Sequence, residues 1–186
     1  MKKRCLWVTD DLSYIKYHDT EWGVPVYDDA VLFEFLILES FQAGLSWVTI
    51  LKKRENFRLA FDNFDYTKIA NYDEDKYQEL LQNKGIIRHR LKIKSAILNA
   101  KLFIEIQKEF GSFSTYIWSF VQGKPICNNF KTTAEIPAKT VLSTQISTNL
   151  KKRGFKFVGD TIMYAYMQAI GMVNDHTTSC FKHPKF

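Results

Sequence analysis

Apolar residues recur at intervals of three and four along most of the chain, whereas apolar and polar residues rarely alternate one by one. The first spacing places apolar side chains on one face of a helix. It predicts helices at residues 30–42, 47–61, 73–81, 86–110 (with a potential break near His89), 114–121, 141–150 and 161–170. Only residues 155–158 resemble a strand. The pattern therefore predicts an all-α protein, with residues 1–186 forming one domain.

Residues typical of helix ends support these boundaries. Asp28 and Asp29 can cap the helix at 30–42, and Gly44 follows its end. Ser46 can cap the next helix, and Asp73 opens the third. Neither an internal repeat nor a linker rich in Ser, Gly or Pro divides the chain.

Composition narrows the class of protein. With 46% apolar residues, 8 Gly and 4 Pro, the chain is neither disordered nor collagen-like. No apolar run approaches the roughly 20 residues that span a bilayer, so no membrane contact is expected. The apolar stretch at residues 5–8 is too short for an export signal, and three cysteines do not form a disulfide scaffold. We therefore expect a cytoplasmic protein, with Cys127 as a buried thiol.

The net charge of +6 is concentrated in two segments. Residues 84–101 contain six basic side chains and no acid, and residues 136–159 contain five and no acid. Solvated helix faces usually mix both signs. Two basic segments without acids favour a polyanionic partner, and nucleic acid is the commonest one.

Two pairs of potential metal ligands lie near opposite ends of the chain. Cys5 and His18 are 13 residues apart, and His176 and Cys180 are four apart. Together they form the Cys₂His₂ donor set that zinc favours in a closed tetrahedral site, which would make the metal structural. On spacing alone His183 could replace His176, and buried cysteines with hydrogen-bonded histidines would give the same pattern.

Glu39 is an acid within the apolar segment 35–41. On a helical wheel it falls on the apolar face, where burying a carboxylate is costly unless something requires it. Four aromatic residues near it in sequence or in the N-terminal segment could surround a planar cationic ring: Trp7, Tyr14, Tyr17 and Trp47. Alternatively, Glu39 pairs with a lysine and the aromatic residues are ordinary core.

Residues 151–161 combine basic side chains with a glycine-bounded turn. Gly154 and Gly159 have the spacing of a P-loop, but Asp160 stands where the phosphate-binding Lys belongs. A turn of this kind that leads into a helix can still aim backbone N–H groups at a DNA phosphate. An ordinary turn with solvated lysines fits equally well. Asp160 would either weaken the grip on DNA or point away, and Asp175 would orient His176 or close its turn.

Several stretches closely resemble the bacterial 3-methyladenine DNA glycosylase I (Tag) family. They are the sequences at residues 22–25, 39–47, 51–55, 86–90, 118–121, 153–159, 167–169 and 173–176, and the resemblance runs from Cys5 to Cys180. It implies a helix-hairpin-helix protein that excises 3-methyladenine from double-stranded alkylated DNA. Because no Lys follows the hairpin, it implies a monofunctional enzyme that leaves an abasic site.

The resemblance also implies roles for individual residues. Cys5, His18, His176 and Cys180 correspond to zinc ligands, which selects His176 over His183. Glu39, Tyr17 and Trp47 correspond to the base pocket, with Trp7 and Tyr14 nearby. The catalytic residue would be Glu39, favoured as the acid that discriminates the cationic base, with a role as base for the attacking water as the alternative. The DNA contacts would come from the Gly44–Leu45 corner and from Lys152, Arg153, Gly154, Lys156 and Gly159. A monomer is expected. The rival hypotheses are a DNA-binding module without chemistry and a zinc-stabilised helical protein that binds a free cationic metabolite.

Overall fold

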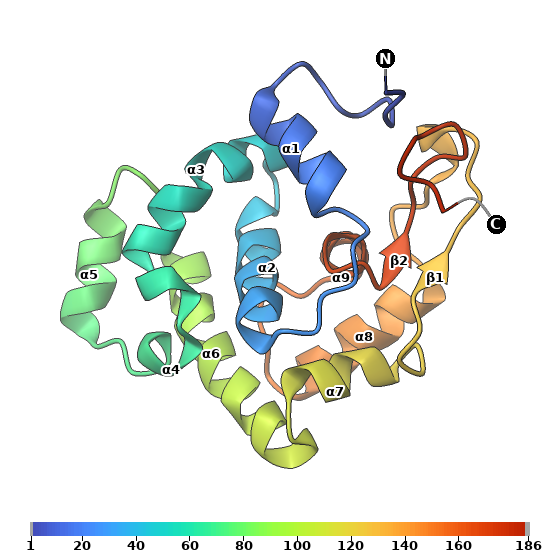
Figure 1. The fold of residues 1–186 in the computed structure, drawn as a ribbon. Helices are drawn as coiled ribbons and strands as arrows, with labels where there is room; N and C mark the ends of the chain where they lie inside the picture. Colours follow the sequence, from blue (N-terminus) through green and yellow to red (C-terminus); the bar gives the residue numbers. More distant parts are fainter. Residues whose placement is uncertain (1, 185–186) are drawn as a thin grey trace.

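The computed structural model describes residues 2–184, which fold mainly as helices (Figure 1). The α-helices are α1 (Leu12–Thr20), α2 (Asp29–Gln42), α3 (Trp47–Ala60), α4 (Tyr66–Ile69), α5 (Glu74–Gln82), α6 (Arg90–Phe110), α7 (Phe113–Ser119), α8 (Val141–Lys152) and α9 (Asp160–Ala169). Two short 3₁₀ turns lie at Asp62–Phe64 and Thr133–Glu135, and two short strands are β1 (Ile126–Cys127) and β2 (Val173–Asn174). No helix among the described residues is long and apolar enough to cross a membrane.

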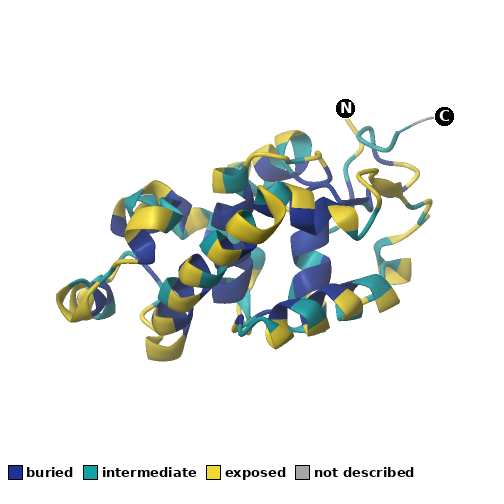
Figure 2. Cartoon of the chain, turned by 90° about the horizontal axis from the view of Figure 1, so that it is seen from below, coloured by how far each residue is buried: buried dark blue, intermediate teal, exposed yellow. Residues whose placement is uncertain are grey.

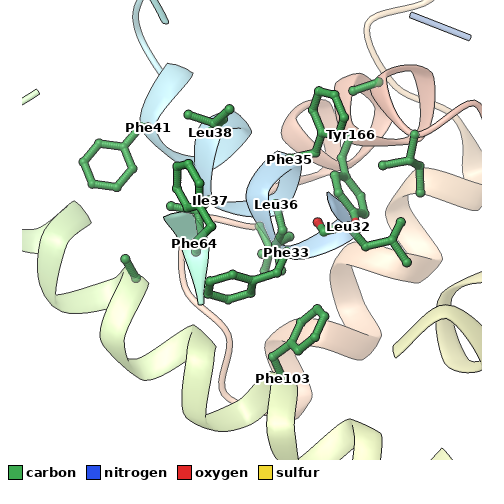
Figure 3. Close-up of a cluster of buried hydrophobic side chains, with 14 of the residues drawn as sticks. Leu32, Phe33, Phe35, Leu36, Ile37, Leu38, Phe41, Phe64, Phe103 and Tyr166 are labelled. Carbon is green, nitrogen blue, oxygen red and sulfur yellow. Dashed lines mark hydrogen bonds between the residues drawn. The ribbon is translucent and has the colours of Figure 1, made fainter. Parts of the chain in front are cut away.

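Helix α2 forms the centre of the molecule. Its ten consecutive residues 32–41 are all buried, because α3, α6, α7 and α9 pack around it. Figure 3 shows Phe103 of α6 and Tyr166 of α9 next to the side chains of α2, and the rings of Phe33 and Phe103 lie 5.1 Å apart. In Figure 1, α3 to α6 lie on one side of α2 and α7, α8 and the strands on the other. Exposed residues occupy the outer faces of the surrounding helices (Figure 2).

Most of the predicted helices are present with similar bounds. The carboxylate of Asp28 accepts a hydrogen bond from the backbone N–H of Val31, and that of Asp73 accepts one from Lys76, as their predicted capping roles require. The predicted helix at 86–110 begins only at Arg90. His89 is its N-cap residue, with Nδ1 accepting from the N–H of Lys92, so residues 86–89 lie outside the helix.

Three details of the sequence analysis are wrong. Residues 155–158 form a turn rather than a strand, and the parallel pair lies instead between β1 and β2, with Ile126 opposite Val173. Two-residue strands are too short to show an alternating pattern. Cys127 lies in β1 and is exposed, so it is not a buried thiol. Helix α1 was not predicted, although Asp11 caps it through the N–H groups of Ser13 and Tyr14.

The two ends of the chain lie on the same side of the molecule (Figure 1). The N–H of Phe181 donates to the carbonyl of Lys3 over 2.9 Å. One connected cluster of buried residues extends from Cys5 to Cys180. The C-terminal segment is therefore packed against the N-terminal one.

Gly171 allows a close approach between two backbone segments. Its φ is +67°, and a Cβ atom there would lie 2.2 Å from the carbonyl carbon of Val24. We expect Gly171→Ala to lower the free energy of unfolding by about 3 kcal/mol or more, from left-handed strain plus steric overlap. Gly111→Ala is the matched control, since φ is +85° but no heavy atom lies within 4 Å of its Cβ position, so only about 1–2 kcal/mol should be lost. Urea denaturation measures both; equal losses would contradict this account.

Candidate active site and metal centre

A cavity of about 320 Å³ opens beside the buried face of α2. It is lined by Trp7, Tyr14, Tyr17, Trp22, Glu39, Trp47, Thr133, Ile136, Ala165 and Gln168. These residues come from the N-terminal segment, α1 and the turn after it, α2, the start of α3, residues 133–136 and α9. The structure thus brings together all five residues that the sequence placed in a base pocket.

Glu39 is an unpaired acid in this cavity. The residue is 3% exposed, and no ion pair or hydrogen bond joins its side chain to any other described residue. Burial raises the pKa of its carboxyl from 4.5 to about 8. The alternative in which Glu39 pairs with a lysine is therefore wrong for the described residues.

The neighbouring acid on the same helix behaves differently. Glu34 is also buried, but its Oε1 accepts from Nε of Arg54 over 2.6 Å. The other arm of Arg54 donates to Glu21 over 2.6 Å, and its guanidinium lies 5.1 Å from the ring centre of Phe35. Arg54 is thus already bonded to Glu34 and Glu21, and Glu39 faces the cavity without it.

Aromatic rings form the walls around Glu39. The ring centres of Tyr17 and Trp47 lie 5.4 Å apart, and those of Trp7 and Tyr14 lie 4.9 Å apart. The Nε1 of Trp47 and the hydroxyl of Thr133 are buried without a protein partner. A flat ligand that stacks on these rings could also satisfy polar groups at the cavity wall.

Four buried donors meet where the two ends of the chain come together. Ligand atoms of Cys5, His18, His176 and Cys180 all lie within 4.8 Å of one another, an arrangement that could hold a metal ion. Sγ of Cys180 lies 3.4 Å from Nε2 of His18 and 3.5 Å from Nδ1 of His176. His183 is not part of the cluster, since its Nε2 lies 3.3 Å from the carbonyl oxygen of Asn128.

Both histidines are oriented through their second ring nitrogen. Nδ1 of His18 lies 2.8 Å from the carboxylate of Asp19, which Arg4 holds through two hydrogen bonds of 2.9 and 2.7 Å. The Arg4 guanidinium and then the His18 ring lower the pKa of Asp19 to about 2. Nε2 of His176 donates to the carbonyl of Trp22 over 3.0 Å. Each imidazole thus directs its free nitrogen at the cluster, as metal-ligating histidines do.

Asp175 does not orient His176, contrary to one of its two expected roles. Its buried carboxylate accepts from the hydroxyl of Tyr164 over 2.6 Å, from the amide of Gln168 over 2.8 Å and from Asn128 over 2.7 Å. It therefore ties the end of β2 to α9 and to the segment after β1.

The predicted DNA contacts lie on two turns. At the corner after α2, Gly44 has φ +82° and Leu45 is 37% exposed. In the turn between α8 and α9, Gly154 has φ +101°, while the side chains of Lys152 and Lys156 are exposed.

Two charged residues of the second turn are already paired. Arg153 makes a two-armed ion pair with Glu109, at 2.6 and 3.0 Å. Asp160, the first residue of α9, accepts from Thr144 over 3.2 Å and lies 3.4 Å from Nζ of Lys139. Its carboxylate is thus directed at α8 and Lys139.

Comparison with known proteins identifies the family. A family model described as methyladenine glycosylase matches residues 7–183. The chain belongs to the methyladenine glycosylase family. The DNA-3-methyladenine glycosylase 1 of Escherichia coli (strain K12) is 50% identical over 182 residues, which cover 98% of this chain and 97% of that protein.

Solved structures agree with this assignment. One of a 3-methyladenine DNA glycosylase I (TAG) has a TM-score of 0.95 at 52% identity, covering 98% of this chain and 100% of its own. A structure that addresses 3-methyladenine recognition by the Staphylococcus aureus glycosylase I has a TM-score of 0.94 at 37% identity, covering 98% and 97%.

Several site residues of this methyladenine glycosylase family member were missed from sequence. Asp19 directly follows His18 of the four-donor cluster, a position from which a carboxylate can reach the ring. Ala165 and Gln168 are three residues apart on α9, so helical spacing could have placed both on one face. Nothing in the sequence pattern points to Thr133, because it lies in an irregular segment.

Glu39→Gln should abolish a pH-dependent loss of stability. A carboxyl whose pKa is raised on folding contributes stability that is complete below pH 4.5 and is lost as the pH rises through about 8. The phenol of Tyr17, whose pKa burial raises, stays neutral over this range. We expect the free energy of unfolding of the variant, relative to that of the wild type, to rise by a few kcal/mol from pH 5 to pH 9, since each pKa unit is worth about 1.4 kcal/mol. Urea denaturation at both pH values measures this; a constant difference would contradict it.

Proposed function

We propose that this protein is a base-excision repair glycosylase that hydrolyses the N-glycosyl bond of 3-methyladenine in alkylated DNA. Membership of the methyladenine glycosylase family supports the reaction. The main support for a methylated, positively charged base as substrate is the unpaired, buried Glu39 in a cavity with aromatic walls. Such a cavity suits a flat ring that carries positive charge.

Charge complementarity is the basis of recognition. Methylation at N3 gives the attached adenine a positive charge, which neutral adenine lacks. Glu39 is mostly protonated in the free protein near neutral pH, since its pKa is about 8. A cation within hydrogen-bond distance favours the carboxylate, so binding of the methylated base is coupled to release of the Glu39 proton to solvent. Glu39 then accepts from the exocyclic amine, while Trp47 and Tyr17 stack on the ring, with Trp7 and Tyr14 beside them.

The chemistry requires little acid catalysis. The positive charge weakens the bond to the sugar, so the base is already a good leaving group. Position and charge stabilisation by the pocket suffice for hydrolysis by water. No lysine lines the described cavity, which supports a monofunctional enzyme that leaves an abasic site without strand cleavage.

The two turns supply the grip on double-stranded DNA. Helices α8 and α9 with the turn at 153–159 act as a helix-hairpin-helix motif, in which the backbone at Gly154 and Gly159 faces a phosphate and Lys152 and Lys156 add charge. Arg153 shapes this turn through Glu109 or exchanges that partner for a phosphate. Gly44 and Leu45 enter the duplex where the extruded base has left the stack.

The metal centre holds a structural zinc ion. A tetrahedral zinc about 2.3 Å from sulfur and about 2.0–2.1 Å from nitrogen places these ligand atoms about 3.5 Å apart. The sulfur–nitrogen distances of 3.4 to 3.7 Å in the cluster match this value. With four protein ligands the ion would join the chain ends and take no part in the reaction.

We further propose that the enzyme acts as a cytoplasmic monomer.

Base release from methylated duplex DNA tests the function. The wild-type protein should release 3-methyladenine with the strand left uncut, and Glu39→Gln should lower the rate by about a hundredfold or more while keeping the fold and the metal. Chromatography of the freed bases measures this. Salt-sensitive DNA binding without base release would favour a binding module, and full activity of the variant would overturn the role of Glu39.

Cys180→Ser tests the metal centre, with Cys127→Ser as the matched control because Cys127 is exposed and is not one of the four clustered donors. The first variant should lose its zinc and at least about 3 kcal/mol of stability, the effect of a ligand present at about 100 times its Kd. The control should keep one zinc per chain. Elemental analysis and thermal unfolding give both values. A Cys180→Ser protein with a full complement of zinc would refute the proposed ligand set.

A further inference from the structure

Lys92 of α6 is a buried cation that the proposed reaction does not use. The residue is 6% exposed, and no carboxylate of the described residues pairs with it. Burial lowers its pKa. Its Nζ instead donates to two backbone carbonyls, those of Phe41 over 2.8 Å and Ala43 over 2.7 Å.

These two carbonyls belong to the C-terminal end of α2, directly before the Gly44–Leu45 corner. The last carbonyls of a helix lack helical partners and carry its negative dipole end, so an ammonium group is well suited to them. The corner itself has little other support. A Cβ atom on Gly44 would meet no heavy atom within 4 Å, and two hydrogen bonds join Gln42 and Leu45 across the corner.

The same face of α6 also holds the second DNA-facing turn. Nζ of Lys92 lies 6.0 Å from the ring centre of Phe157. Asn99, two helical turns further along α6, is fully buried and bonds the backbone of Lys156 twice, with its Nδ2 donating to the carbonyl and its Oδ1 accepting from the N–H, both over 2.9 Å. From α2, Ser40 donates to the carbonyl of Phe157 over 3.2 Å.

We infer that Lys92 is a positioning residue that holds the Gly44–Leu45 corner in the orientation needed to enter duplex DNA. Helix α6 serves as a common support, since Lys92 fixes the corner and Asn99 fixes the 153–159 turn at a set distance from it. A duplex gripped by the turn then meets the corner at one defined base step. This inference rests on the proposed function, because it assigns the corner a role in base extrusion.

A comparison of two DNA substrates tests the inference. One is a fully paired duplex with a single 3-methyladenine, and the other carries the same lesion in an unpaired bubble between identical duplex flanks. Lys92→Met should lower kcat/KM on the paired duplex by about tenfold to a hundredfold, the effect of a displacement of about 1 Å. Activity on the bubble should be unchanged within about twofold, as should binding of free 3-methyladenine measured by tryptophan fluorescence, since neither needs the corner.

Matched variants separate positioning from charge and from folding. Lys94→Met removes the same charge from an exposed position on the same helix and should not change the ratio between the two substrates. Lys92→Arg keeps the charge and the donors and should restore much of the duplex activity. Lys92→Gln, which keeps one donor, replaces the methionine variant if that protein does not fold. In a Leu45→Ala background, Lys92→Met should have little further effect.

Each contrary outcome has a distinct meaning. The inference is overturned if Lys92→Met keeps its duplex activity, if it loses duplex and bubble activity equally, or if Lys94→Met reproduces its effect. A wild-type protein that releases no 3-methyladenine from either substrate would instead refute the proposed function.

Discussion

Burial of the Glu39 carboxyl on the central helix α2 determines the chemistry of the cavity. Helix α2 is enclosed on every side, so an acid at position 39 is buried wherever its side chain points. The guanidinium of Arg54 is bonded to Glu34, five residues before Glu39. Glu39 therefore faces the aromatic cavity alone, with its pKa raised to about 8. The burial that costs folding stability also prepares a site in which a cationic ring is favoured over a neutral one.

The metal centre and the cavity share a wall. The ring centre of Trp7 lies 5.3 Å from that of His18, and the ring centre of Trp22 lies 4.7 Å from that of His176. Both tryptophans also line the cavity. A metal ion that fixes the two histidines would therefore keep these aromatic side chains in place, although it lies outside the cavity. The packing of the two chain ends against each other therefore also positions aromatic side chains of the pocket.

The long helices could be predicted from the sequence, because caps such as Asp28 and regular apolar spacing are local signals. Residue type and spacing indicated the donor set, but the family resemblance was needed to select His176 over His183. The apolar surroundings of Glu39 could be predicted too, but its lack of a partner could not. That depends on Arg54 of α3 reaching Glu34 rather than Glu39, which only tertiary packing decides. The β1–β2 pair was missed because two residues show no period, and Cys127 was misjudged because burial was inferred from residue type alone. The support of both turns by α6 is likewise a tertiary feature, since Lys92 and Asn99 look like ordinary helix residues in the sequence.

The most direct test of the account is the pKa of Glu39 itself. NMR titration of the protein with ¹³C-labelled glutamate carboxyl groups, assigned through Glu39→Gln, reports the protonation of this side chain. The account predicts a midpoint near 8 in the free protein, and a lower one when a cationic methylated base occupies the cavity. A midpoint near the ordinary value of 4.5 in the free protein would mean that the carboxyl is solvated or paired, and would contradict the proposed basis of recognition.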